Sequence, residues 1–369
     1  MPPPELFTPL QIGGITLPNR IVVSPMCQYS ADDGCMNDWH HVHLGHLALS
    51  RAGLLMVEAT HVTREGRITH GCTGLYNEHN EAAMARVILA CRRLTQYPIG
   101  VQVGHAGRKA SSQVPWEGRQ WLEPAQSPWQ TVAPSPLAYG PGWPVPRELE
   151  TDEVKALPEA FVSAALRAKR IGFDVFEFHS AHGYLMHQFL SPVANQRKDQ
   201  YGRNRMQAPL EISRAVRDVW PRERALGARI SGNDWVEGGL GPDDAVAYAR
   251  ELKRIGFDYV CVSSGALSAT ARIPVAPGYQ LPFAERVRKA VDIKVRAVGM
   301  IAEPDQAQEV VASGKADMVA MARAFLDNPR WVWHAAERFG VKLDYPPPYE
   351  RSRSDLWPGA KLARPRETA

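Results

Sequence analysis

The sequence lacks long apolar segments and paired cysteines. No run approaches the roughly 18 consecutive apolar residues that a membrane-spanning helix requires. The N-terminal Met-Pro-Pro-Pro-Glu has neither the basic nor the apolar region of a cleavable signal peptide. The five cysteines are odd in number, show no C-x-x-C spacing, and belong to a chain too long to depend on disulfide bonds. We therefore expect a cytoplasmic protein with reduced thiols and no membrane partner.

A charge excess of one sign is also missing. The chain has 43 lysines and arginines against 39 aspartates and glutamates, which gives a net charge of +4. Its only basic concentration is the tail from Arg351 to Arg366. Proteins that bind phosphate backbones usually carry a strongly basic face, so this balance predicts no nucleic-acid partner.

No G-x-G-x-x-G motif opens a helix, which argues against a Rossmann domain. Instead, β-prone runs alternate with amphipathic stretches of helical length, such as Glu153–Ile171, 243–256, 281–291 and 304–314. The eight β-prone runs are 20–26, 53–60, 97–104, 173–179, 226–231, 257–263, 293–299 and 316–322. Repeated β–α units predict a single α/β domain over residues 1–369, folded as a closed (β/α)8 TIM barrel.

Glycines at the predicted helix-to-strand junctions support this alternation. Gly53, Gly172, Gly256 and Gly314 each stand between a helical stretch and the next β-prone run. Helices commonly end at a glycine in the left-handed conformation. We therefore expect all four glycines to be C-caps.

The segment from His105 to Pro146 interrupts the alternation. It contains tryptophans 116, 121, 129 and 143 and many prolines, which disfavour a helix. Long loops inside a domain usually bind or cover something, and surface decoration is the alternative. We predict a capping segment, residues 105–150, over the end of the third strand.

The most informative motif is the run Phe173–Phe178 followed by His179-Ser-Ala-His182-Gly-Tyr184. An alternating strand ends in a turn that carries two imidazoles and a phenol. In right-handed helical geometry, His179 and His182 would face the same way and could bind one substrate oxygen. Tyr184 could then deliver a proton from another side. The same two histidines could instead be metal ligands or a structural pair.

Other strand ends carry polar or small residues, and in a TIM barrel the active site lies at the carboxyl ends of the strands. Gly299, Ala322 and Arg323 suit a phosphate site, because small residues let the backbone approach an anion and an arginine can pair with it. Arg323 could equally be a structural ion-pair partner. Arg229, inside an apolar strand, requires a carboxylate or an electron-rich ligand ring. Candidates at the ends of the first three runs are Ser24–Tyr29, Ala59, and Gln102 with His105–Lys109.

Two further patterns indicate structural roles. Cys27 alone is typical of a small buried residue, and nothing in the sequence indicates an acyl substrate for it. The histidines at 40, 41, 43 and 46 fall on the first outer helix, without the cysteines or carboxylates of common zinc sites. We expect them to serve helix surface and packing, and we predict no bound metal.

Eight motifs are spread over the chain: Leu17-Pro-Asn-Arg-Ile21, Ser24-Pro-Met-Cys-Gln-Tyr29, Asp38-Trp-His-His-Val-His43, Glu65-Gly-Arg-Ile-Thr69, His105-Ala-Gly-Arg-Lys109, Ala181-His-Gly-Tyr-Leu185, Gly278-Tyr-Gln280 and Tyr349-Glu-Arg351. Taken together, they resemble those of the old yellow enzymes, which are flavin-dependent ene-reductases, and in particular their thermophilic-like subgroup. Cys27 with Tyr29, and the His-x-x-His form at 179–182, are typical of that subgroup. One stretch departs from the family pattern: Tyr201-Gly-Arg-Asn-Arg205 is shorter than the usual Tyr-Gly-Gly-Ser-Leu-Glu-Asn-Arg and follows strand four, beside the predicted site. The resemblance covers nearly the whole chain.

The resemblance implies non-covalent FMN, with NADPH or NADH as the hydride donor. It implies that hydride passes from N5 of FMN to an alkene activated by a carbonyl or nitro group. His179 and His182 would bind the oxygen of that group, and Tyr184 would give the proton. Gln102 would bond the pyrimidine edge of FMN, and Arg229 would place positive charge near N1 and O2. The implied cofactor residues are Ser24, Pro25, Met26, Cys27, Ala59, Gln102, Arg229, Gly299, Ala322 and Arg323. The implied substrate residues are Cys27, Tyr29, Lys109, His179, His182, Tyr184 and Arg351.

The C-terminal arm, residues 341–369, supports a prediction about assembly. Its segment Asp344-Tyr-Pro-Pro-Pro-Tyr-Glu-Arg351 predicts an extended arm, too stiff to fold back as a helix and too polar to join a core. Composition alone favours a disordered terminus. The resemblance implies instead that the arm reaches a neighbouring subunit and that Arg351 completes its pocket. A homodimer, or a dimer of dimers, is then expected.

Two other functions fit part of the pattern. Another FMN-barrel chemistry, such as tRNA uridine reduction, would call for a basic face and a nucleic-acid-binding domain. A metal-dependent barrel hydrolase would use His179 and His182 as metal ligands.

Overall fold

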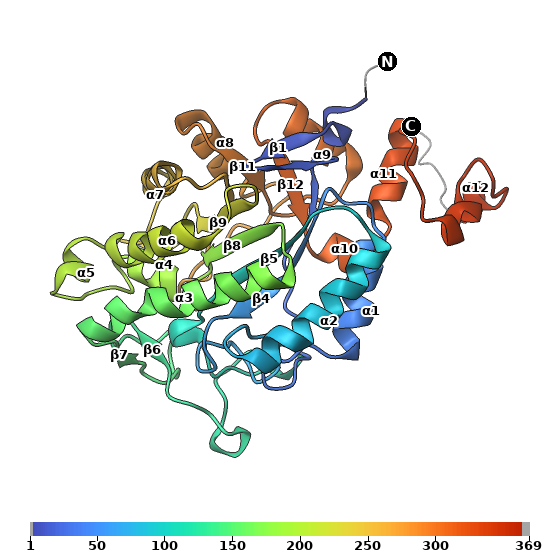
Figure 1. Cartoon of the computed structure of the whole chain (residues 1–369). Helices are drawn as coiled ribbons and strands as arrows, with labels where there is room; N and C mark the ends of the chain where they lie inside the picture. Colours follow the sequence, from blue (N-terminus) through green and yellow to red (C-terminus); the bar gives the residue numbers. More distant parts are fainter. Residues whose placement is uncertain (1–2, 364–369) are drawn as a thin grey trace.

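Eight parallel strands pair edge to edge and close into a barrel in the computed structural model, which describes residues 3–363 (Figure 1). Around the barrel the order is β10-β11-β12-β3-β4-β5-β8-β9, and β12 pairs with β3 to close the ring. Each strand falls within or overlaps one predicted run, so the predicted (β/α)8 barrel is confirmed. The strands are β3 (Ile21–Val23), β4 (Leu54–His61), β5 (Ile99–Gly104), β8 (Val175–Ser180), β9 (Ala225–Ser231), β10 (Tyr259–Ser263), β11 (Lys294–Ala297) and β12 (Met318–Met321).

Helices surround this barrel because their apolar faces cover the outward side chains of the strands (Figure 1). In α3, for example, Val154, Phe161 and Ala165 are buried, as the amphipathic pattern predicted. The helices are α1 (Asp38–Ala48), α2 (Glu78–Leu94), α3 (Thr151–Ile171), α4 (Leu185–Leu190), α5 (Gln200–Arg203), α6 (Gln207–Val219), α7 (Pro242–Ile255), α8 (Leu281–Ala290), α9 (Pro304–Ala312), α10 (Arg323–Asp327), α11 (Trp331–Phe339) and α12 (Ala360–Ala363).

A short hairpin, β1 (Leu10–Ile12) with β2 (Ile15–Leu17), fills the amino end of the barrel. Its apolar side chains form one buried cluster with residues at the starts of the strands, such as Leu54 and Val175. The opposite, carboxyl end is therefore the end left for a site.

The capping segment lies at the end of the barrel opposite the β1–β2 hairpin (Figure 1). Residues 105–150 contain single turns of 3-10 helix and one parallel pair of two-residue strands, β6 (Val132–Ala133) and β7 (Arg147–Glu148), but no α-helix. Contacts between indole rings help to hold this irregular segment together. Trp121 and Trp143, for example, pack edge to face with ring centroids 6.1 Å apart.

The C-terminal arm differs from its prediction. Pro347–Ser352 forms a 3-10 helix, and the rings of Tyr345 and Tyr349 lie 4.5 and 5.8 Å from that of Trp333 in α11. The expectation of an extended, polar arm was wrong over this stretch, because the two tyrosines bury aromatic surface and hold the chain against the barrel. Beyond it, the arm continues to α12 at the side of the molecule (Figure 1). The last six residues of the predicted arm, and the first two of the chain, lie outside the described residues.

The structure also bears on the histidine-rich stretch, the cysteines, and the expectations about membrane helices and metal sites. The histidine-rich stretch forms α1, where His40 is buried beside Glu58, with 3.4 Å between Nε2 and Oε1. All five cysteines are free thiols. Within residues 3–363, no helix is long and apolar enough to cross a membrane, and no cluster of three or more His, Cys, Asp or Glu side chains is arranged to hold a metal ion.

The predicted glycine C-caps are confirmed at two of four junctions. Gly172 and Gly256 cap α3 and α7 with φ of 94° and 100°, and Gly314 takes φ of 72° one residue after the cap of α9. Gly53 was predicted wrongly. It is required for close approach, because a Cβ there would lie 2.0 Å from the carbonyl oxygen of Asn19.

Gly53→Ala should therefore destabilise the protein by about 2 kcal/mol, since the added methyl has no room beside the Asn19 backbone. Urea denaturation of the purified protein measures this. Gly45→Ala in α1 is the matched control: its new Cβ would lie 3.7 Å from Leu94, and alanine favours the helix. Equal stability of the two variants would contradict the packing argument.

Candidate active site

The turn after β8 brings the three predicted catalytic side chains together. His179 lies in the extended strand, and His182 adopts a left-handed φ of 57°. The predicted right-handed helical spacing of the two histidines was therefore wrong. Their rings nevertheless meet, with centroids 5.0 Å apart and 3.3 Å between Nδ1 of His182 and Nε2 of His179. The Tyr184 ring stands edge-on to His179 at 4.7 Å.

Gly183 makes this tight turn feasible. It has φ of 73°, and a Cβ there would lie 2.4 Å from the carbonyl oxygen of Ala266. Only glycine tolerates both conditions. The chain can then pass from His182 to Tyr184, which becomes the N-cap residue of α4.

A buried histidine–aspartate pair, His187 with Asp234, holds the turn in place through hydrogen bonds. The Gly183 N–H donates to Nδ1 of His187 at 2.8 Å, so the ring proton sits on Nε2, which donates to Asp234 Oδ1 at 2.8 Å. Asp234 Oδ2 also accepts from the Ser191 hydroxyl at 2.7 Å. Sequence reasoning missed this pair. The available signal was His187 itself, which follows the motif in the short helix α4.

Burial sets the charge state of the two site histidines. It holds the pKa of both His179 and His182 well below the usual range, and the nearby Arg229 guanidinium adds to the effect. Both rings are therefore neutral at pH 7. A neutral imidazole offers one N–H donor and one acceptor, so each ring can donate one hydrogen bond without carrying a charge.

Lys109 lies against this turn. Its ammonium donates to the carbonyl oxygens of His182 and Ala266 at 2.8 and 2.9 Å, and lies 5.0 Å from the Tyr184 ring centroid and 4.7 Å from that of Tyr139. Burial lowers the pKa of Lys109 to about 7. The structure thus places this predicted substrate residue beside the turn that carries the predicted catalytic residues.

Cys27 and Tyr29 complete one wall of the site. Together with Tyr184 they pack against a small buried cluster of Ile68, Cys72, Ala106 and Ala110. Burial raises the pKa of the Cys27 thiol and of the Tyr184 phenol well above their usual values. Cys27 is therefore a thiol and not a nucleophilic thiolate, and Tyr184 keeps its proton at neutral pH.

Arg229 reaches the same region from β9. Its guanidinium donates weakly to the hydroxyls of Ser24 and Ser263, at 3.4 and 3.3 Å. The buried Nε has no partner, and within residues 3–363 no carboxylate forms an ion pair with Arg229. Of the two partners expected from the sequence, the carboxylate is therefore not found, and an electron-rich ligand remains.

Ser263 is a further residue that the sequence did not reveal. It ends β10, for which no functional residue was predicted, and its hydroxyl lies 2.7 Å from His182 Nε2 as well as 3.3 Å from Arg229. One hydroxyl thus links a predicted substrate residue to a predicted cofactor residue. Serine is too common at strand ends to have been noticed from the sequence.

The predicted phosphate residues lie at neighbouring strand ends, because β11 pairs with β12. Gly299, after β11, has φ of 113°, and a Cβ there would lie 2.6 Å from Gln280. Ala322 is the N-cap residue of α10, and Arg323 begins that helix with an exposed side chain. Elsewhere, Ala59 sits where a bulge shifts the register of β4 against β5.

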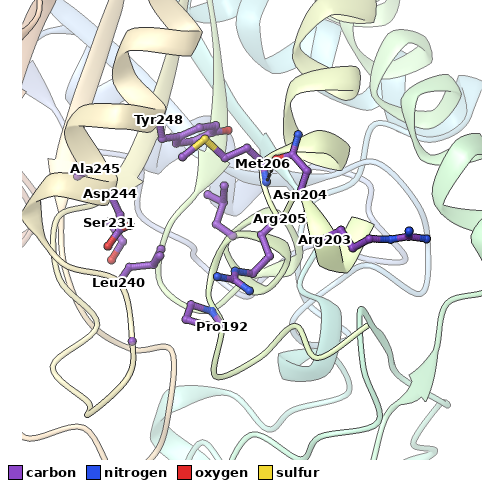
Figure 2. A pocket seen from close by; sticks show the side chains of 12 residues that line it. Pro192, Arg203, Asn204, Arg205, Met206, Ser231, Leu240, Asp244, Ala245 and Tyr248 are labelled. Carbon is purple, nitrogen blue, oxygen red and sulfur yellow. Dashed lines mark hydrogen bonds between the residues drawn. The ribbon is translucent and has the colours of Figure 1, made fainter. Parts of the chain in front are cut away.

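Two predicted features lie apart from this cluster. Arg351 is exposed in the arm, and in the described part of one chain no hydrogen bond or ion pair joins it to the histidines. The shortened loop lines a separate cavity of about 250 Å³, where Asn204 and Arg205 lie across from Asp244 and Tyr248 of α7 (Figure 2). The lining of this cavity includes none of the predicted site residues.

Comparison with known proteins is consistent with this site. The model of the NADH:flavin oxidoreductase / NADH oxidase family matches residues 5–340. The chain is 42% identical over 351 residues to an NADPH dehydrogenase of Geobacillus thermodenitrificans, covering 94% of this chain and 98% of the relative. It is 38% identical over 352 residues to an NADPH dehydrogenase of Bacillus subtilis, with the same coverage. The solved structure of morphinone reductase in complex with tetrahydroNAD matches with a TM-score of 0.75 at 30% identity, covering 96% of this chain and 97% of that one.

The lowered pKa of Lys109 predicts a pH-dependent contribution to stability. Its folded pKa of about 7 lies below the unfolded value of about 10.4. Between these values the unfolded chain binds a proton that the folded chain does not, so stability rises with pH. Relative to Lys109→Met, the wild type should gain about 1.4 kcal/mol per pH unit from pH 7.5 to 9 in urea unfolding. Lys169→Met, at an exposed lysine of α3, is the control. Parallel stability curves for Lys109→Met and the wild type would disprove the shift.

Proposed function

The chain belongs to the NADH:flavin oxidoreductase / NADH oxidase family of FMN-dependent enzymes, the old yellow enzyme family, and we propose that it is an ene-reductase. Its proposed substrates are alkenes activated by a carbonyl or nitro group, with NADPH or NADH as the source of hydride. The observation that carries the proposal is the convergence of His179, His182 and Tyr184 at one rim of the barrel.

The residues present fit FMN. The unpartnered Nε of Arg229 suits an electron-rich ring edge, and the glycine conformation at Gly299 suits a closely approaching phosphate. When bound, FMN supplies the hydride that it has received from the nicotinamide. We propose that Arg229 and Gln102 hold the ring, and that Gly299, Ala322 and Arg323 hold the phosphate. Ser24–Cys27 and Ala59 would line the ring.

His179 and His182 would bind the substrate oxygen. Both rings are buried and neutral, and each can turn one N–H toward an oxygen placed between them. Negative charge develops on that oxygen as hydride reaches the β-carbon. Donors already in place at such an oxygen contribute about 3–4 kcal/mol each to the rate.

Tyr184 would supply the proton to the α-carbon. Its phenol is protonated at pH 7, and its ring faces the wall formed by Cys27 and Tyr29. A raised pKa makes the phenol a weak acid, so the transfer requires a basic carbanion-like carbon. Hydride addition to the β-carbon would leave an enolate or nitronate, and its α-carbon would accept that proton.

The alternative metal-dependent hydrolase has less support. Within residues 3–363 the His179–His182 pair has no third ligand of the usual kind in place, and the Arg229 guanidinium adds positive charge beside it. A divalent cation would be repelled there, whereas an oxyanion would be attracted.

Tyr184→Phe tests the mechanism. The variant should bind FMN and accept hydride from NADPH at the wild-type rate, but reaction with cyclohexenone should slow by about 100-fold, because only the proton donor is lost. Stopped-flow absorbance follows the two half-reactions separately. Tyr139→Phe, on the other side of Lys109, is the control. An unchanged rate with cyclohexenone would remove Tyr184 from the mechanism.

The second part of the proposal is that the protein forms a homodimer or a dimer of dimers, in which Arg351 completes the pocket of the neighbouring subunit. Its support is the packing of the arm, which anchors Tyr349 on Trp333 and leaves Arg351 exposed two residues later. An arginine held in this way can serve a neighbouring subunit's pocket.

Arg351→Ala should leave FMN content unchanged and raise the KM for cyclohexenone about tenfold, as expected for the loss of one charged contact. Arg353→Ala is the matched control, because Arg353 already pairs with Asp355 in its own chain. Light scattering of a protein truncated after Tyr345 reports on assembly. A fully active monomer would refute this part.

A further inference from the structure

A charged residue stands in the middle of the buried strand β8. Glu177 has a fully buried side chain and lies two residues before His179. Side chains two apart on a strand point to the same side, so Glu177 faces the barrel interior, one layer below the site. The proposed mechanism gives this carboxylate no role.

Three donors from three other strands converge on Glu177. Gln102 Nε2 donates to Oε1 at 2.8 Å, the Tyr259 hydroxyl donates to Oε2 at 2.7 Å, and the buried Arg296 guanidinium also donates to Oε2. Gly227 makes room for this arrangement, because a Cβ there would lie 2.2 Å from the Tyr259 ring. The carboxylate is thus paired with a cation and hydrogen-bonded on both oxygens.

This arrangement decides how the Gln102 amide is oriented. An ionised carboxylate only accepts hydrogen bonds, so the amide must turn its NH₂ group toward Glu177. Gln102 and Glu177 stand directly opposite each other in the β5–β8 register, which keeps the contact short. The amide oxygen of Gln102 therefore points elsewhere, and no group within residues 3–363 donates a hydrogen bond to it.

We infer that Glu177 is a positioning residue for the cofactor: it holds Gln102 so that the amide oxygen is presented to the imide N–H of the flavin ring. This inference rests on the proposed role of Gln102 in binding FMN. Arg296 serves the same end, because its guanidinium forms a buried ion pair with the Glu177 carboxylate and holds it in place. A protonated or amide side chain at 177 could donate as well as accept, and Gln102 would then turn either way.

The double variant Glu177→Gln/Arg296→Met tests the inference. It removes both charges together, because removing one alone would leave the other buried without a partner. Apo-protein is titrated with FMN, and the dissociation constant is read from quenching of flavin fluorescence. The same titration is repeated in a Gln102→Leu background, which has no amide to orient.

If Glu177 acts through Gln102, the double variant should weaken FMN binding about tenfold when Gln102 is present, the effect of one buried hydrogen bond. In the Gln102→Leu background the effect should fall below about twofold. Equal weakening in both backgrounds would show that the network merely packs the barrel, and would overturn the inference. No weakening in either background would overturn it as well.

Tyr259→Phe gives a second test if the double variant does not fold. It keeps both charges and removes one donor to Glu177, so a smaller loss of FMN affinity is expected, again only when Gln102 is present. An effect independent of Gln102, or none, would count against the inference. The proposed ene-reduction is tested separately, by cyclohexenone reduction in the wild type, so failure of one idea does not decide the other.

Discussion

The pairing of β12 with β3 joins the last barrel strand to the first and decides where the functional side chains lie. Because all eight strands are parallel, closing the ring brings every carboxyl end to one rim. The β1–β2 hairpin fills the other end with apolar side chains. Residues separated by up to about three hundred positions, such as Ser24 and Arg323, thereby belong to the same rim.

Below that rim the barrel interior is polar in one layer, which is unusual for a core. Glu177 and Arg296 are both fully buried, and two nitrogens of Arg296 have no hydrogen-bond partner. A buried ion pair contributes little net stability compared with apolar packing. Its value here is orientation, since an accept-only carboxylate fixes an amide at the floor of the site. Gly227 is part of the same arrangement, because its missing side chain admits Tyr259.

The chemistry of the rim follows from burial more than from residue type. His179 and His182 are neutral because the site is desolvated and already holds the Arg229 guanidinium. The same burial keeps Tyr184 protonated. The proposed catalyst thus has hydrogen-bond donors without a negative charge beside them, which suits an oxygen that becomes anionic during the reaction. The pair of His187 and Asp234 holds the turn in the geometry that these roles require.

The sequence by itself determined the barrel and singled out the residues of the predicted catalytic turn, because periodicity and motifs are local properties of the chain. It did not determine the conformation of the turn. His182 is left-handed and Gly183 lies close to the carbonyl oxygen of Ala266, and no local pattern encodes that contact. Gly53 and the aromatic packing of Tyr349 were misread for the same reason. Ser263, Asp234 and the partners of Glu177 come from distant strands and loops, so only the tertiary structure could bring them to the site and show what each one holds.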